Sequence, residues 1–131
     1  SFDLHWYRSV SNPQTDLSVV PVISYARMTR PYRELMSELS RRIGPSVRVF
    51  ASASLSASLK MIAAGIAVGP YPRALARDFL KSEQIVEFEA GFRPQPLQFT
   101  ASYLSEPRSF LVENSAEIAQ SVALNWDKSQ P

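Results

Sequence analysis

The fold is decided by residues 47–72, VRVFASASLSASLKMIAAGIAVGPYP. The stretch opens with the alternating pattern of a strand at residues 47–51. Leu55, Leu59 and Ile62 then recur at helical spacing, and Gly65 closes that helix, which begins at Ser52 or Ser54. A second short strand at residues 66–69 follows, before the prolines that turn the chain into the next helix. This order predicts a strand–helix–strand unit with parallel strands.

The residues before this stretch predict two further strands and one helix. Residues 2–7 alternate, and residues 19–25 form a β-branched run typical of a strand buried on both faces. The helix is capped by Thr29 and stopped by Gly44-Pro45. Its apolar stripe consists of Tyr32, Leu35, Met36, Leu39 and Ile43.

The residues after it predict a third helix, two strands and a last helix. The third helix turns Leu75, Phe79 and Leu80 inward, and residues 85–89 form a strand. A loop rich in Pro and Gly occupies residues 91–96 and is the clearest internal boundary. Beyond it, residues 97–103 alternate as a long strand. The capping box of residues 114–117 then opens a helix with Ile118, Val122 and Trp126 on one stripe.

Strands alternating with helices predict an α/β fold, with a mainly parallel sheet and helices on both faces. Residues 1–96 form one lobe in this interpretation. Residues 97–131 are a strand and a helix without other partners, so we expect them to belong to a second, incomplete lobe whose other half lies outside this sequence. Their apolar side chains then need cover from elsewhere.

Composition and charge exclude several classes of function. Apolar residues make up 45% and charged residues 20% of the chain, as in folded globular proteins. The chain has no cysteine and one histidine, His5, which excludes thiolate and paired-histidine metal sites. A net charge of +2 is too small to argue for nucleic-acid binding. We find no nucleophile–base pair, metal set or Gly-rich phosphate loop, so we expect neither an enzyme nor a cofactor.

Several motifs in this order resemble the effector-binding domain of LysR-type transcriptional regulators. The resemblance rests on the strand at 47–50, the helix ending at Ala64-Gly65, and the short Gly-containing strand followed by Pro72. It extends upstream to residues 4–7 and 21–25, and downstream to residues 85–88 and the Pro-rich loop. The sequence departs from the family at Ala67, where a second glycine is common, and at Tyr71, where an aliphatic residue is usual.

The resemblance implies a lobe like those of type 2 periplasmic binding proteins. The chain crosses from the first lobe to the second and back, so this sequence would hold the second lobe and the returning segment. A small effector binds between the lobes in this family. DNA is bound only through an N-terminal domain that this sequence lacks. We therefore expect self-association through the regulatory domain, no membrane partner and a cytoplasmic location.

The expected ligand-binding residues lie at the carboxyl ends of the strands. One group follows Tyr25, and the other opens the helix after residue 51, where free N–H groups favour anions. Arg27 and Arg30 could add a charged clamp, so we expect a small organic anion. The resemblance places effector contacts on Met28, Thr29, Arg30 and Tyr32. The candidates are Arg27, Met28, Thr29, Arg30, Tyr32, Ser52 and Ser54.

The same residues also allow purely structural roles. In this alternative interpretation Thr29 only caps its helix, Tyr32 belongs to the core, and both arginines are solvated. The function we expect is an effector sensor that passes its signal to a DNA-binding domain. The alternative is a fragment of a solute-binding protein from a transport system, which has the same two-lobed fold.

Overall fold

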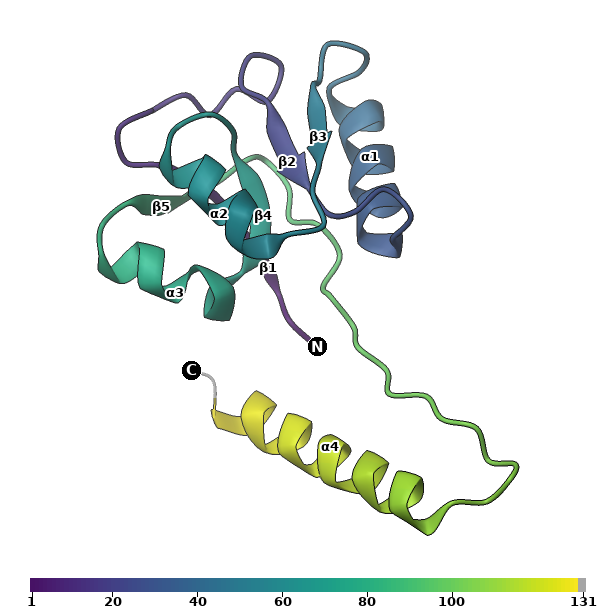
Figure 1. Cartoon of the computed structure of the whole chain (residues 1–131). Helices are drawn as coiled ribbons and strands as arrows, with labels where there is room; N and C mark the ends of the chain where they lie inside the picture. Colours follow the sequence, from purple (N-terminus) through teal and green to yellow (C-terminus); the bar gives the residue numbers. More distant parts are fainter. Residues whose placement is uncertain (130–131) are drawn as a thin grey trace. The chain divides into compact units, whose positions relative to one another are not determined.

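The computed structural model describes residues 1–129. Contacts divide the chain into two units: residues 2–97, and Ser1 together with the residues after Leu97. Figure 1 shows the elements in chain order. They are β1 (Leu4–Ser9), β2 (Val22–Ser24), α1 (Arg30–Arg42), β3 (Val49–Ala51), α2 (Leu55–Ala63), β4 (Gly69–Pro72), α3 (Arg73–Lys81), β5 (Ile85–Phe88) and α4 (Phe110–Ser129).

The sheet is not mainly parallel, and this part of the prediction is wrong. β1 lies between β4 and β5 and is antiparallel to both, while β2 and β3 form a parallel pair. A parallel bridge from Val22 to Val68 connects the two groups. The strands joined through helices, β2 to β3 and β4 to β5, do run in the same direction. β1 runs the other way, and its direction follows from its antiparallel pairing with β4 and β5.

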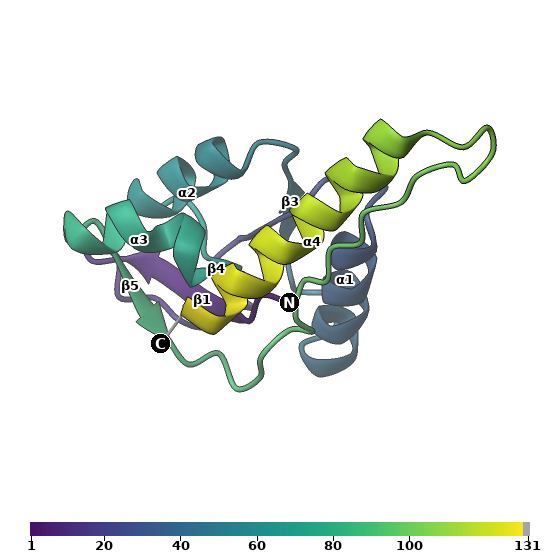
Figure 2. The same ribbon diagram turned by 90° about the horizontal axis from the view of Figure 1, so that it is seen from below.

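Helices cover both faces of these strands. α1 contributes Leu35 and Leu39 to one buried cluster with Trp6 and Val22, while α2 contributes Leu59 and Ile62 to another. Seen from below, α2 and α3 lie next to each other, and α1 lies apart from them (Figure 2). Within β1, Trp6 faces the first cluster and Tyr7 the second, and both are buried. β1 is therefore covered on both sides.

Local signals place the first two helices correctly. Thr29 is the N-cap of α1, where its side chain accepts a hydrogen bond from the Tyr32 N–H, and Gly44 adopts a positive φ of 89° just after the helix. Ser54, not Ser52, is the N-cap of α2. On α3, Ala76 is buried, whereas Leu75 is 42% exposed, so the prediction that Leu75 faces inward is wrong.

β4 includes the prolines that the sequence assigned to a turn. β4 is the outer strand of its three-stranded sheet, and an outer strand tolerates a missing N–H. Gly69 is required at its start, because a Cβ there would lie 2.7 Å from the Ile23 carbonyl oxygen. The absence of a side chain at Gly69 lets the start of β4 lie against β2.

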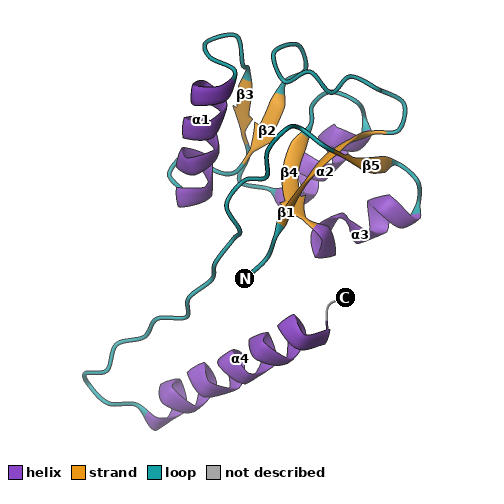
Figure 3. Cartoon of the chain, turned by 180° about the vertical axis from the view of Figure 1, so that it is seen from behind, coloured by secondary structure: helices purple, strands orange, loops and turns teal. Residues whose placement is uncertain are grey.

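The unit after Leu97 differs from its prediction in two ways. The expected strand at residues 97–103 is absent, apart from a bridge between Leu97 and Phe2, and Figure 3 shows the segment leading to α4 as loop. Alternating apolar and polar residues show that a segment suits a strand with two different faces. A strand forms only when a neighbouring strand also pairs with its backbone N–H and C=O groups. The last helix begins at Phe110 rather than at residue 114, because Ser109 bonds the N–H groups of Val112 and Glu113.

α4 exposes its apolar stripe. None of its described residues is buried, and Ile118, Val122 and Trp126 are 56%, 62% and 39% exposed. No helix among residues 1–129 has the length and apolar character needed to cross a membrane.

Candidate functional site

The two groups of candidate residues meet at one edge of the β2–β3 pair. These strands are parallel, so their carboxyl ends lie together, with Ser24 beside Ala51 in register. The Ser52 N–H donates a hydrogen bond to the Ser24 carbonyl oxygen at 3.2 Å. The turn at residues 25–29 and the start of α2 therefore leave the sheet from the same place. We call Ser24, residues 25–29 and residues 52–54 the edge site.

Ser24 is the residue of this site that the sequence prediction missed. It is fully buried, and its hydroxyl oxygen has no hydrogen-bond partner among the described residues. Leaving a buried hydroxyl unpaired costs about 1–3 kcal/mol. The available signal was a serine that ends a run of apolar β-branched residues, immediately before the predicted site.

Two buried tyrosines, Tyr25 and Tyr71, pack against each other next to Ser24. The rings of Tyr25 and Tyr71 lie 5.3 Å apart, and the Tyr25 hydroxyl donates to the Pro70 carbonyl oxygen at 2.9 Å. The Tyr71 hydroxyl donates to the Ser24 carbonyl oxygen at 3.4 Å. Burial raises the pKa of Tyr71 to about 12 and also raises that of Tyr25. Both phenols are therefore neutral hydrogen-bond donors at physiological pH.

The two arginines of the predicted clamp differ. The Arg30 Nε lies 2.6 Å from the Glu34 carboxylate along α1, so its charge is already paired. Arg27 is exposed and makes no ion pair within residues 1–129. Met28, between them, is 89% exposed. Arg27 is the cation of this turn that stands available to a ligand.

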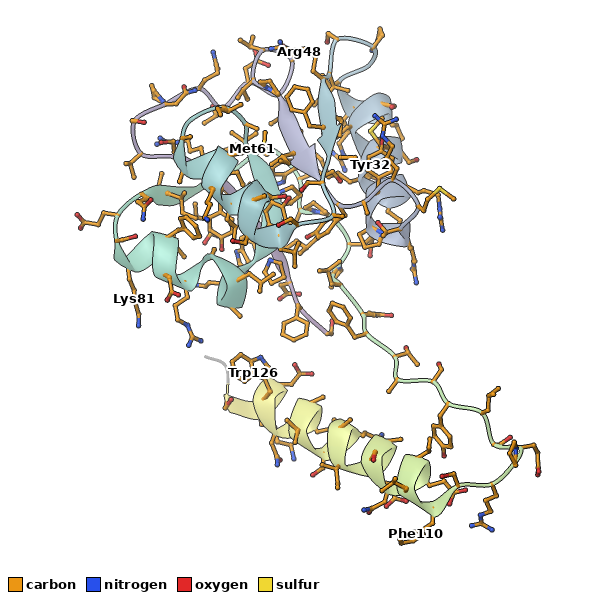
Figure 4. All side chains as sticks on the ribbon, viewed as in Figure 1. Tyr32, Arg48, Met61, Lys81, Phe110 and Trp126 are labelled. Atoms are coloured by element: carbon orange, nitrogen blue, oxygen red, sulfur yellow. The ribbon has the colours of Figure 1, made fainter. Side chains whose placement is uncertain are left out.

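The remaining candidates have visible structural roles. Thr29 caps α1, and Tyr32 is partly buried against the cluster that contains Tyr25 and Tyr71. In Figure 4, Tyr32 is labelled on α1. The capping role of Thr29 and the packing of Tyr32 are the structural roles that the sequence offered as alternatives to ligand binding. Neither role prevents the residue from also contacting a ligand.

At the start of α2, no acidic side chain compensates the positive end of the helix dipole. The Ser54 hydroxyl accepts from the Ala57 N–H at 3.2 Å, and the Ser52 hydroxyl donates to the Ser54 carbonyl oxygen at 3.1 Å. The first turn contains no acidic residue. The earliest N–H groups of a helix lack partners within it, and together with the helix dipole they favour an anion.

A small pocket adjoins the edge site and shares Tyr25 with it. Its volume is about 20 Å³, which is enough for roughly one water molecule. Organic ligands occupy pockets of roughly 300–1,000 Å³. This pocket therefore does not enclose an organic effector. It is lined by Leu4, Tyr25, Pro31, Glu34, Leu35, Glu38, Pro70, Pro94 and Gln95.

Metal chemistry finds no support in the part of the chain that the structure describes. No three His, Asp or Glu side chains among residues 1–129 are grouped so as to hold a metal ion. His5 lies on β1, where its Nδ1 is 2.6 Å from the Glu87 carboxylate of β5, and this contact links two neighbouring strands.

Solved structures with a similar fold include regulatory domains of LysR-type regulators. The regulatory domain of HypT from Salmonella typhimurium, with bromide bound, matches with a TM-score of 0.61 and 14% identity. The match covers 92% of this chain and 62% of that domain. Full-length LysG from Corynebacterium glutamicum, with its effector Arg bound, matches with a TM-score of 0.55 and 18% identity over 88% of this chain and 42% of LysG.

A third match is the regulatory domain of MetR from Neisseria meningitidis, a LysR family regulator. Its TM-score is 0.50 and its identity 13%, over 71% of this chain and 49% of that one. No family model and no curated protein matches the sequence. The chain thus shares the fold of LysR-type regulatory domains and spans less than two thirds of each.

Proposed function

We propose that this chain, with the fold of a LysR-type regulatory domain, is the effector-sensing part of a transcriptional regulator. A small organic ligand binds at the edge site, between the lobe of residues 2–97 and a second lobe. Its binding shifts the balance between lobe arrangements, and DNA-binding domains in a self-associated, cytoplasmic regulator respond. No catalysis is assigned to the chain.

The observation that carries this proposal is the buried, unpaired Ser24 hydroxyl at the meeting point of the two loops. A hydroxyl left without a partner is ready to bond a ligand, and the adjoining pocket is too small to enclose one. A ligand that covers the edge from outside, held on its other side by a second lobe, satisfies both observations once the turn at residues 25–29 moves enough to expose the Ser24 hydroxyl.

An anion fits the edge best. The start of α2 offers backbone N–H groups with no acidic side chain in its first turn. Arg27 supplies an unpaired cation on the facing turn, whereas Arg30 is held by Glu34. Ser52, Ser54, Met28, Thr29 and Tyr32 complete the proposed contacts.

The residues after Leu97 contribute to the second lobe in this proposal. α4 carries an apolar stripe with no buried residue, and the matched HypT domain is longer than this chain covers. The missing part of such a domain would supply the cover that Ile118, Val122 and Trp126 need. A solute-binding protein of a transport system is the second candidate, because it would use the same two-lobed geometry. The matched structures favour the regulator.

The test is a calorimetric titration of the intact two-lobe domain with small carboxylic acids selected by thermal shift. Ser24→Ala should weaken the binding of a selected acid roughly 10- to 150-fold, since a hydrogen bond to a charged group contributes about 1.5–3 kcal/mol. Ser82→Ala, a surface change at the end of α3, is the control and should bind as wild type does. Equal affinity in all three proteins would refute the edge site.

A further inference from the structure

One flank of α3 carries a row of three cations. Arg73, Arg77 and Lys81 are spaced four residues apart, so each is offset from the last by about 40° around the helix axis. They form one row about 12 Å long. All three residues are exposed. Figure 4 shows Lys81 extending from the last turn of α3 into open space.

The row is not neutralised by neighbouring acids. Within residues 1–129, none of the three cations takes part in an ion pair. The contrast with α1 is direct, because Arg30, Arg41 and Arg42 are all bonded to glutamates of that helix. α3 has one acidic residue, Asp78, which lies about 100° from Arg77 around the helix axis and is three residues before Lys81, close enough to face it.

Keeping three like charges in a row works against the helix. Cations four residues apart repel each other and destabilise an isolated helix. Lys81 is stabilised by Asp78, three residues earlier, and by the C-terminal end of the helix dipole, whereas no acid of α3 lies three or four residues from Arg73 or Arg77. The charges of α3 therefore give no reason for Arg73 and Arg77, and a binding partner does.

We propose that Arg73, Arg77 and Lys81 bind an acidic helix of another polypeptide, with carboxylates spaced four residues apart. A straight row along a helix matches such carboxylates in pitch. Arginine, which provides two of the three cations, binds carboxylates in bidentate fashion. This surface is separate from the edge site and requires no ligand there.

A nucleic acid is the less suitable partner. The chain's net charge is +2, and the aromatic residue of α3, Phe79, is partly buried against the core, so α3 exposes no ring for base stacking. The acidic helix is therefore the occupant that the charge pattern favours.

The test measures fluorescence anisotropy of a labelled helical peptide with Glu at three positions four residues apart. The control peptide has the same composition, with its glutamates distributed around the helix. The full chain should bind the first peptide at least about fivefold more tightly in 50 mM salt, and the preference should shrink at 200 mM.

The triple variant Arg73→Gln, Arg77→Gln, Lys81→Gln should lose this preference. A matched variant of equal charge, Lys60→Gln, Arg93→Gln, Lys128→Gln, should keep it. Circular dichroism should show both variants folded, with the first at least as stable as wild type because its repulsion is relieved. Equal binding of the two peptides, or equal loss in the two variants, would overturn the proposal. So would a DNA duplex that binds the row more tightly than either peptide.

Discussion

Replacing Ser24 by alanine should stabilise the lobe while weakening ligand binding. Ser24 is fully buried, and its hydroxyl has no partner among the described residues. An unpaired buried hydroxyl costs about 1–3 kcal/mol, so removing its oxygen stabilises the folded state. The small void left behind loses packing contacts, and this loss cancels part of the stabilisation. We therefore expect the free energy of unfolding to rise by about 1 kcal/mol, which corresponds to roughly 4–8 °C in Tm for a domain of this size.

Ser58 provides a control with the same chemistry and the opposite expected sign. It is equally buried, but its hydroxyl donates to the Ser54 carbonyl oxygen at 2.9 Å. Ser58→Ala loses that hydrogen bond and should lower the free energy of unfolding by about 1 kcal/mol. Scanning calorimetry of the three proteins measures both changes. If Ser24→Ala melts below wild type, as Ser58→Ala does, the Ser24 hydroxyl is already bonded and the reasoning fails.

Leu39 is fully buried on α1, so Leu39→Ala should lower the free energy of unfolding by roughly 2–5 kcal/mol, whereas Leu75→Ala, at a half-exposed site, should cost far less; denaturant melts that give equal losses would contradict the packing described. Burial raises the pKa of Tyr7 and Tyr71 to about 12, above the ordinary value of 10, so the folded state holds these protons more tightly than the unfolded chain does. Their contribution is fully present below pH 10 and should be lost as the pH rises to 12, and Tyr7→Phe should lessen that loss in pH-dependent melts; a loss confined to pH below 9 would argue against it.

Local chemistry explains what the sequence could predict. Thr29 and Gly44 bound α1 because a cap and a left-handed turn depend on residues within a few positions. The choice between Ser52 and Ser54 for α2 could not be made, since either hydroxyl can cap. The structure resolves it through the hydrogen bond from the Ala57 N–H to Ser54.

The errors came from contacts that are distant in sequence. The direction of β1 depends on its pairing with β4 and β5, which lie more than 60 residues away in sequence, and no local pattern encodes it. Ser24 was overlooked because the lack of a partner for its hydroxyl depends on the elements packed around it. The strand expected after Leu97 lacks a partner strand, and alternation alone could not reveal this.

Hydrogen exchange on the chain by itself tests most directly whether residues 2–97 are a lobe and α4 part of another. We expect the amides of β1, β2 and β4 to be protected together by global stability, and those of α4 to exchange far faster until the rest of its lobe is supplied. Protection of α4 equal to that of β1, in a chain that sedimentation shows to be monomeric, would contradict this account.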